Sequence, residues 1–233
     1  VVWNPEADEI IGGYRFTRWK MASFHENGQP YVNTEHLFDF SQKFIETDFP
    51  HCIEMARAFV QPKYQNAAGG RKALFALDNL WDGIGGLVAS DPTVKYLTGK
   101  VTIYKTSPEM SRKAMIYYLD MSFGDREGLI TSKRPETCTP EQAAFFKEMF
   151  TGADYKENYA ILNNYVKSLD DNIPPFIHLY IGLSPTMKTF GTTFDPDFGD
   201  CYDTAMMITA HDLYPEKFER YMGSYERCKE YKK

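Results

Sequence analysis

The sequence lacks any long uninterrupted hydrophobic run, and none of its apolar segments approaches the roughly 20 residues of a membrane-spanning helix. It also lacks an excess of positive charge, because its formal net charge is −6, which argues against general nucleic-acid binding. A signal-peptide pattern and an initiator Met are both missing. The abrupt start at Val1-Val2-Trp3 already reads as a strand. We therefore expect that an N-terminal portion of the natural protein is not included.

Cysteine is scarce: Cys52, Cys138, Cys201 and Cys228 are widely spaced, without a CxxC pair. In a chain of this length, such spacing is typical of reduced thiols in the cytoplasm and predicts no metal site. Cys52 could serve as a nucleophile in principle, but we interpret it as a buried apolar thiol.

Several catalytic signatures are also absent. The sequence contains no GxSxG elbow, GxGxxG, Walker A or HxxxxD motif, which argues against α/β-hydrolases, dinucleotide-binding proteins, P-loop proteins and glycerolipid O-acyltransferases. The segment "DPDFGD" resembles a calcium loop but has Met206 where that loop carries its last Glu, so we predict a hairpin turn. Asp78 and Asp82, one helical turn apart, could hold a metal, but we interpret them as residues of a polar helix face.

The composition predicts a sizeable packed core. Of the 233 residues, 43% are hydrophobic and 15% aromatic, which suits one domain with an elaboration. We expect a single domain over residues 1–214 with a partly helical insertion over about 124–173. Residues 215–233 would form a charged helical tail.

The order of elements predicts an α/β fold. A strand over residues 51–61 precedes a glycine turn and a helix with one apolar stripe, and "VKYLTGKVTIY" and "SPEMSRKAMIYYLDMSF" follow as strand and helix. This βαβα order makes the two strands parallel. We also expect two strands at the start, a helix over 34–47 beginning at Thr34, a short helix at "PPFIHLYIGL", and a closing hairpin from Lys188.

Two charged residues interrupt the strand over 51–61. Glu54 and Arg57 are three residues apart, so in an ideal strand their side chains would point to opposite faces. A β-bulge would be needed to bring both to one site, and it would free backbone N–H groups for a ligand. The alternative is a structural ion pair that joins the strand to a neighbour.

These segments resemble the acyl-carrier-protein-dependent N-acyltransferases of the GNAT superfamily, which make N-acyl amino acids and lyso forms of ornithine and glycine lipids. Members are often labelled hemolysins, and acyl-homoserine-lactone synthases are more distant relatives. The most diagnostic motif is Glu-x-x-Arg-x-x-Val at Glu54, Arg57 and Val60, followed by "FALDNLWDGIGGL". The resemblance is strongest to Bacteroidetes forms. It implies a mixed, splayed β-sheet flanked by helices on both faces.

The resemblance also implies the donor and the acceptor. The superfamily's pyrophosphate loop, Gln/Arg-x-x-Gly-x-Gly/Ala, is degenerate here, since residues 65–70 read QNAAGG. This favours the phosphopantetheine thioester of an acyl carrier protein over acyl-CoA, and no tightly bound cofactor. The expected acceptor is a small amino acid, with glycine favoured. The acyl chain would be long, and its 3-hydroxylation is left open.

Acyl transfer to an amine needs a base, an oxyanion donor and, for the thiolate, an acid. Glu54 is the expected base or amine-binding carboxylate, Arg57 would orient it or bind the acceptor's carboxylate, and Tyr118 is the expected acid. Freed N–H groups near Phe59 and Val60 would bind the thioester carbonyl. The residues expected to bind the acyl chain and pantetheine are Phe59, Val60, Gln61, Gln65, Gly69, Gly70, Arg71, Trp81 and Tyr104.

Three alternatives stay open. The chain could be an N-acetyltransferase that uses acetyl-CoA, a membrane-lysing hemolysin as the family label suggests, or a non-catalytic acyl-binding module. A lipid product is also compatible with peripheral contact with a membrane.

Overall fold

The computed structural model describes residues 1–65, 70–223 and 225, and its central element is a six-stranded sheet. In spatial order, the strands are β1 (Val2–Asn4), β2 (Glu9–Arg18), β4 (Cys52–Val60), β5 (Tyr96–Ile103), β8 (Cys201–Thr209) and β7 (Lys188–Asp195). β4 and β5 are parallel, and the other neighbours are antiparallel. A second, two-stranded sheet pairs β3 (Phe38–Phe40) with β6 (Ile130–Ser132). The mixed sheet confirms the predicted α/β class.

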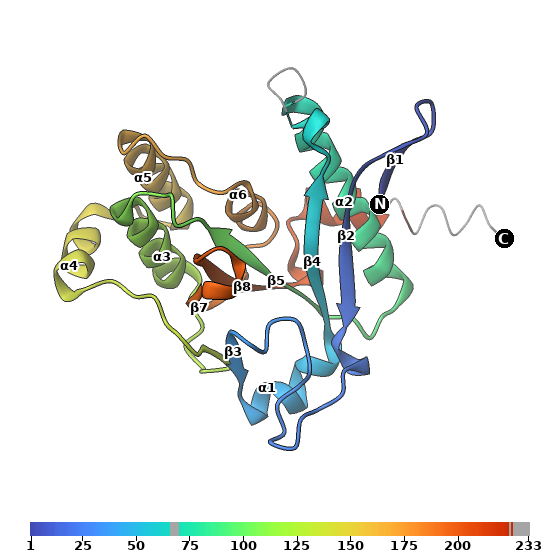
Figure 1. Cartoon of the computed structure of the whole chain (residues 1–233), viewed down its shortest axis with the longest axis horizontal. Coiled ribbons are helices and arrows are strands. Elements are labelled where there is room, and N and C mark those ends of the chain that lie inside the picture. Colours follow the sequence, from blue (N-terminus) through green and yellow to red (C-terminus); the bar gives the residue numbers. More distant parts are fainter. Residues whose placement is uncertain (66–69, 224, 226–233) are drawn as a thin grey trace.

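Helices cover the six-stranded sheet on both faces (Figure 1). They are α1 (Gln42–Thr47), α2 (Gly70–Ser90), α3 (Glu109–Phe123), α4 (Pro140–Met149), α5 (Tyr155–Ser168), α6 (Pro175–Ile181) and α7 (Pro215–Phe218). On one face, Ile53 of β4 belongs to a core cluster with Trp81 of α2 and Ile177 of α6. On the other face, Trp19 and Phe44 form a second cluster with residues of β3, β7 and β8. Both clusters bury large apolar side chains, which is the main favourable contribution to folding.

β4 and β5 pair only over part of their length. Their ladder joins Cys52–Met55 to Tyr96–Gly99, whereas β4 continues to Val60 and β5 to Ile103. Beyond that point the two strands diverge (Figure 1). Backbone groups on the facing edges of the diverging segments therefore lack a partner in the neighbouring strand. We call this opening the splayed gap, and it confirms the predicted splayed sheet.

The predicted βαβα order is confirmed by β4, α2, β5 and α3. The expected helix over 34–47 is wrong in its first half. Phe38 and Phe40 are buried around the exposed Asp39 and form β3, so pairing with the distant β6 overrides the local helical pattern. α1 begins only at Gln42, with Ser41 as its N-cap.

The closing hairpin is confirmed as β7 and β8. "DPDFGD" forms its turn, where Gly199 has a φ of +72°, a conformation that glycine adopts without steric cost. The segment expected as an insertion contains β6, α4 and α5, and "PPFIHLYIGL" contains α6. Among the described helices, none has the length and apolar character needed to cross a bilayer.

Candidate active site

Glu54 is a buried carboxylate at the start of the splayed gap. Its residue is only 2% exposed, and Oε2 accepts a hydrogen bond of 3.1 Å from the indole Nε1 of Trp19. Because side chains alternate along β4, Glu54 shares its face with Cys52, while Ile53 faces α2. Thr98 of β5 is its partner in the parallel ladder. Glu54 therefore lies one residue before the last pair that joins the two strands.

Burial raises the pKa of Glu54, because a charged carboxylate loses its hydration. The Trp19 hydrogen bond opposes this rise, as do the Asn33 N–H and the Thr34 hydroxyl, which face the carboxylate. The charge of Lys100 lowers the pKa further. Within the described part, Oε1 of Glu54 and Oγ1 of Thr34 complete no hydrogen bond of normal geometry. Trp19 thus holds one carboxylate oxygen, and the other faces Asn33 and Thr34 without completing a hydrogen bond of normal geometry in the described structure.

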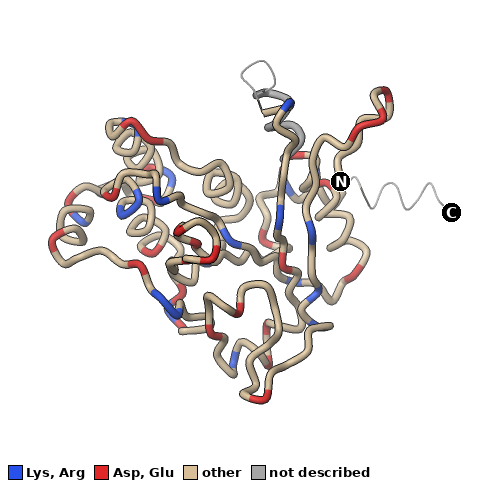
Figure 2. The backbone as a smooth tube through the Cα atoms, in the orientation of Figure 1, with Lys and Arg blue, Asp and Glu red and all other residues tan. Residues whose placement is uncertain are grey.

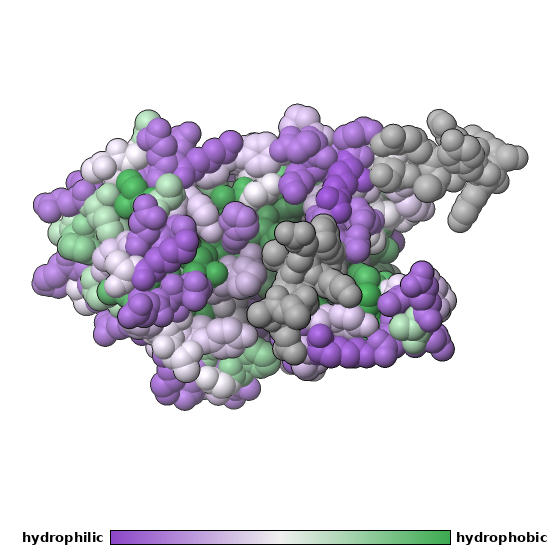
Figure 3. All heavy atoms as spheres, turned by 90° about the horizontal axis from the view of Figure 1, so that it is seen from above, coloured by the Kyte–Doolittle hydropathy of each residue, from purple (hydrophilic) through white to green (hydrophobic). Residues whose placement is uncertain are grey.

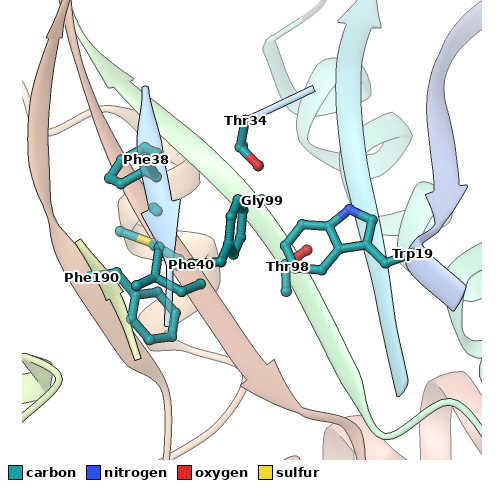
Figure 4. Close-up of a pocket in the computed structure, with 10 residues that line it drawn as sticks. Trp19, Thr34, Phe38, Phe40, Thr98, Gly99 and Phe190 are labelled. Atoms are coloured by element: carbon teal, nitrogen blue, oxygen red, sulfur yellow. The ribbon is translucent and has the colours of Figure 1, made fainter. Parts of the chain in front are cut away.

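A small apolar pocket lies beside the residues that hold this carboxylate. Trp19 and Thr98 lie on one side of it, and Phe38 and Phe190 on the other (Figure 4). Its lining residues are Trp19, Thr34, Phe38, Phe40, Thr98, Gly99, Ile130, Phe190, Ala205 and Met206. Trp19 and Thr34, which contact or face Glu54, are among them, although Glu54 itself is not.

β4 contains a bulge at Arg57. Gly13 and Arg15 of β2 pair with Phe59 and Ala56, so β4 has one extra residue between these pairs. Arg57 has a φ of +57°, a left-handed conformation that is strained for a residue with a side chain. Its side chain is exposed, and no ion pair joins it to Glu54 in the described structure. The bulge that the shared-site hypothesis requires is therefore present, whereas the two charged side chains are not paired.

Tyr118 lies in the core rather than beside Glu54. It is fully buried on α3, and its hydroxyl donates a hydrogen bond of 2.8 Å to the carbonyl oxygen of Tyr155. Its ring packs against Phe123 and Phe150. Its role as an acid stays a prediction, and the geometry accounts for it as a structural residue.

A different tyrosine, Tyr180 of α6, reaches the splayed gap. A Cβ built on Gly99 would lie 2.6 Å from the Tyr180 hydroxyl oxygen, so the hydroxyl rests directly against the last paired residue of β5. Tyr180 is buried, and its ring contacts Trp81 edge-on at 5.9 Å between centroids. Burial raises its pKa, so the hydroxyl keeps its proton. The sequence analysis missed Tyr180 because nothing local relates α6 to β5.

Phe59 and Val60 end β4, which forms one side of the gap, and Gln61 and Gln65 follow that strand. Phe59 is 48% exposed, and Val60 is buried. The side-chain amides of Gln61 and Gln65 donate to backbone oxygens of Ile10 and Val60, so these glutamines hold the end of β4 in place.

The remaining predicted binding residues lie in α2 or follow β5. Trp81 is buried in the core, and Tyr104 is 62% exposed just beyond β5. Gly69 lies outside the described residues. Gly70 and Arg71 belong to α2, whose side chains are described from Asp78 onwards.

A buried charged array continues from the pocket along β5, β7 and β8. Lys100 Nζ lies 2.7 Å from Asp203 Oδ2 and 3.8 Å from Asp195 Oδ2. Both aspartates are 1% exposed. Together with Cys201 they bring three potential metal ligands within 4.8 Å of one another. The Lys100 ammonium already supplies a positive charge to these carboxylates, so we interpret the group as an ion-pair array.

A mixed sheet that splays beside a buried carboxylate and a strand bulge defines the class of GNAT acyltransferases. Residues 1–73, which include Glu54 and the bulge, match the model of the GNAT acetyltransferase domain. No solved structure gives a significant match.

Two curated proteins extend the match to nearly the whole chain. A glycine N(alpha)-acyltransferase of Phocaeicola vulgatus is 41% identical over 225 residues, which cover 97% of this chain and 69% of the relative. A protein of the same name from Bacteroides thetaiotaomicron is 42% identical over 228 residues, which cover 97% and 66%. The chain thus spans about two thirds of the length of these relatives. The chain belongs to the GNAT-type N-acyltransferases, as the resemblance implied.

Proposed function

We propose that this protein transfers a long fatty acyl group from a thioester to the amine of glycine, giving an N-acyl glycine. The observation that carries the proposal is Glu54, a buried carboxylate with a raised pKa at the start of the splayed gap, whose Oε1 completes no hydrogen bond of normal geometry with the described residues. The names of both relatives support glycine as the acceptor.

In this proposal, the ammonium group of the acceptor reaches Glu54 Oε1 beside Thr34 and gives it a proton, which leaves a neutral amine. The amine nitrogen then attacks the thioester carbonyl, forming a C–N bond. Backbone N–H groups of β4 beyond the bulge stabilise the developing oxyanion. As the C–S bond breaks, the Tyr180 hydroxyl gives a proton to the thiolate sulfur, and the nitrogen releases its second proton to water, which leaves a neutral amide. Glu54 and Tyr180 regain their starting protonation states by exchange with water.

We propose an acyl carrier protein as the donor. Its phosphopantetheine arm would enter between the carboxyl ends of β4 and β5, where Lys63 comes three residues after β4 and Lys105 two residues after β5. Acidic and basic residues intermingle over the molecule in Figure 2, and these two lysines pair with Glu9 and Asp200. The carboxylates of an acidic carrier protein would replace Glu9 and Asp200 as partners of these two lysines at the mouth of the gap. Seen from above, hydrophobic atoms show among hydrophilic ones near the middle of the face, which suits an entering acyl chain (Figure 3).

The test is a mass-spectrometric assay. The protein is incubated with long-chain acyl carrier protein, its 3-hydroxy form, acyl-CoA or acetyl-CoA, together with glycine, ornithine and the other amino acids. We expect N-acyl glycine from the carrier-protein donors, and no product from Glu54→Gln. Product from acetyl-CoA alone would establish an N-acetyltransferase instead.

The proposal also places the protein in the cytoplasm, with peripheral contact to a membrane that receives the lipid product. Sedimentation with lipid vesicles tests this placement. Protein that stays in the supernatant with and without N-acyl glycine in the vesicles would contradict the membrane contact.

A further inference from the structure

The pocket beside Glu54 is lined by Thr98 and Gly99 of β5, and Lys100 follows them on the same strand. Thr98 lies opposite Glu54, and side chains two residues apart on a strand share a face about 6.6 Å apart. Lys100 therefore follows Thr98 on the same face. Its cross-strand partner, Ala205, lines the pocket together with Thr98. The influence of the Lys100 charge on the Glu54 carboxylate agrees with this proximity.

We propose that Lys100 binds the carboxylate of the acceptor, so that the site selects α-amino acids with a free carboxyl group over simple amines. This inference rests on the proposed function. With a hydrogen bond of about 2.8 Å at each end, a small amino acid would bridge two such neighbouring positions on one face of the sheet. Its amine meets Glu54 Oε1, and its carboxylate meets the Lys100 ammonium.

The surroundings of Lys100 suit this task. The Lys100 ammonium forms an ion pair with Asp203 Oδ2 at 2.7 Å, and Asp195 lies at 3.8 Å, beyond hydrogen-bond reach. The Thr102 hydroxyl donates to Asp203 Oδ1 at 2.6 Å, which fixes that carboxylate. Lys100 is thus held in one position by Asp203 while keeping N–H donors for a ligand. His36 Nε2, 3.6 Å from Asp195 Oδ2, lies at the outer end of the array.

Arg57 is the other cation that the sequence suggests for the acceptor's carboxylate. Its side chain is exposed and lies beyond the bulge, whereas the Lys100 side chain is 19% exposed beside the pocket wall. A cation withdrawn from water discriminates more strongly between a carboxylate and a neutral group than an exposed one. The geometry therefore favours Lys100.

The experiment compares glycine with glycinamide, which has the same amine but no carboxylate. The preference for glycine is the ratio of kcat/KM for glycine to kcat/KM for glycinamide. We expect Lys100→Met to lower this ratio by about tenfold or more relative to the wild type. Lys100→Arg should keep most of the wild-type ratio. Lys43→Met, which removes an exposed lysine paired with Glu127, is the matched control and should leave the ratio unchanged. The ratio does not depend on the amount of folded enzyme.

Lys100→Met leaves two buried aspartates without their lysine and threatens folding, so Lys100→Met/Asp203→Asn provides a second variant without the cation. If either variant slows both acceptors equally, Lys100 acts only on Glu54 and the inference is wrong.

A second readout needs no acyl donor. Saturation-transfer NMR with glycine or glycinamide alone should show glycine binding to the wild type and its loss in Lys100→Met. Lys100-dependent glycine binding without turnover would uphold the inference and contradict the proposed function. Equal glycine binding by wild type and variant would overturn the inference, whatever the assay shows.

Discussion

The indole N–H of Trp19 and the carboxylate of Glu54 form a buried hydrogen bond of 3.1 Å across 35 residues of sequence. This bond joins the residue just after β2 to the middle of β4 and fixes one carboxylate oxygen. Trp19 itself is held by stacking on Phe49, with ring centroids 4.9 Å apart. The predicted base is thus oriented by packing that the functional motif does not contain.

Glu54→Gln should slow catalysis strongly and stabilise the fold at neutral pH. Gln can accept the Trp19 hydrogen bond without a buried charge. Because folding raises the pKa of Glu54, its favourable contribution to stability is present below the unfolded pKa and is lost as pH rises through the folded pKa. We therefore expect the variant to melt above the wild type at about pH 8, with a gap that narrows as the pH falls. Its kcat should fall by about 100-fold or more. Equal melting temperatures at every pH would contradict the buried charge.

Tyr180 and Tyr118 should respond differently to replacement by Phe. Tyr180→Phe removes the hydroxyl at the splayed gap, so we expect kcat to fall by about 100-fold with little change in stability. Tyr118→Phe leaves the carbonyl of Tyr155 without its donor and should cost about 1–2 kcal/mol of unfolding free energy, with kcat nearly unchanged. Steady-state kinetics and urea unfolding on both variants check this. The reverse pattern would restore Tyr118 as the acid.

Gly99→Ala tests how closely Tyr180 approaches β5. The added methyl group would lie 2.6 Å from the Tyr180 hydroxyl oxygen, so we expect a loss of about 1–3 kcal/mol. Gly99→Ala/Tyr180→Phe removes the contacting oxygen and should recover most of that loss. Additive destabilisation in the double variant would show that the two residues do not touch.

The bulge at Arg57 should be visible as backbone strain. Glycine adopts a φ of +57° freely, whereas alanine does not. We expect Arg57→Gly to be more stable than Arg57→Ala by about 1 kcal/mol in urea unfolding. Both variants remove the same side chain, so the comparison isolates the Cβ. A more stable Arg57→Ala would mean that residue 57 leaves this conformation in solution.

Local patterns predicted much of the fold because their periodicities are short. The alternation of side chains along β4, the apolar stripe of α2 and the Asp/Pro/Gly turn before β8 are each specified by a short stretch of neighbouring residues. The 34–47 segment failed because Phe38 and Phe40 form a strand only against β6, about 90 residues away. Glu54 was identifiable as a charged residue inside an apolar strand. Burying a charged group costs free energy, and such groups are found mainly at functional sites.

The sequence by itself determined the succession of elements, the α/β class and, through the Glu54 and Arg57 motif, the family. Only the tertiary structure placed Trp19 and Lys100 on the same face of the sheet as Glu54, and Tyr180 against Gly99 at the splayed gap. The physical reason is that a strand specifies which of its own side chains share a face. Which distant segments pack against that face depends on how the whole chain buries its apolar surface. No local repeat in the sequence predicts that packing.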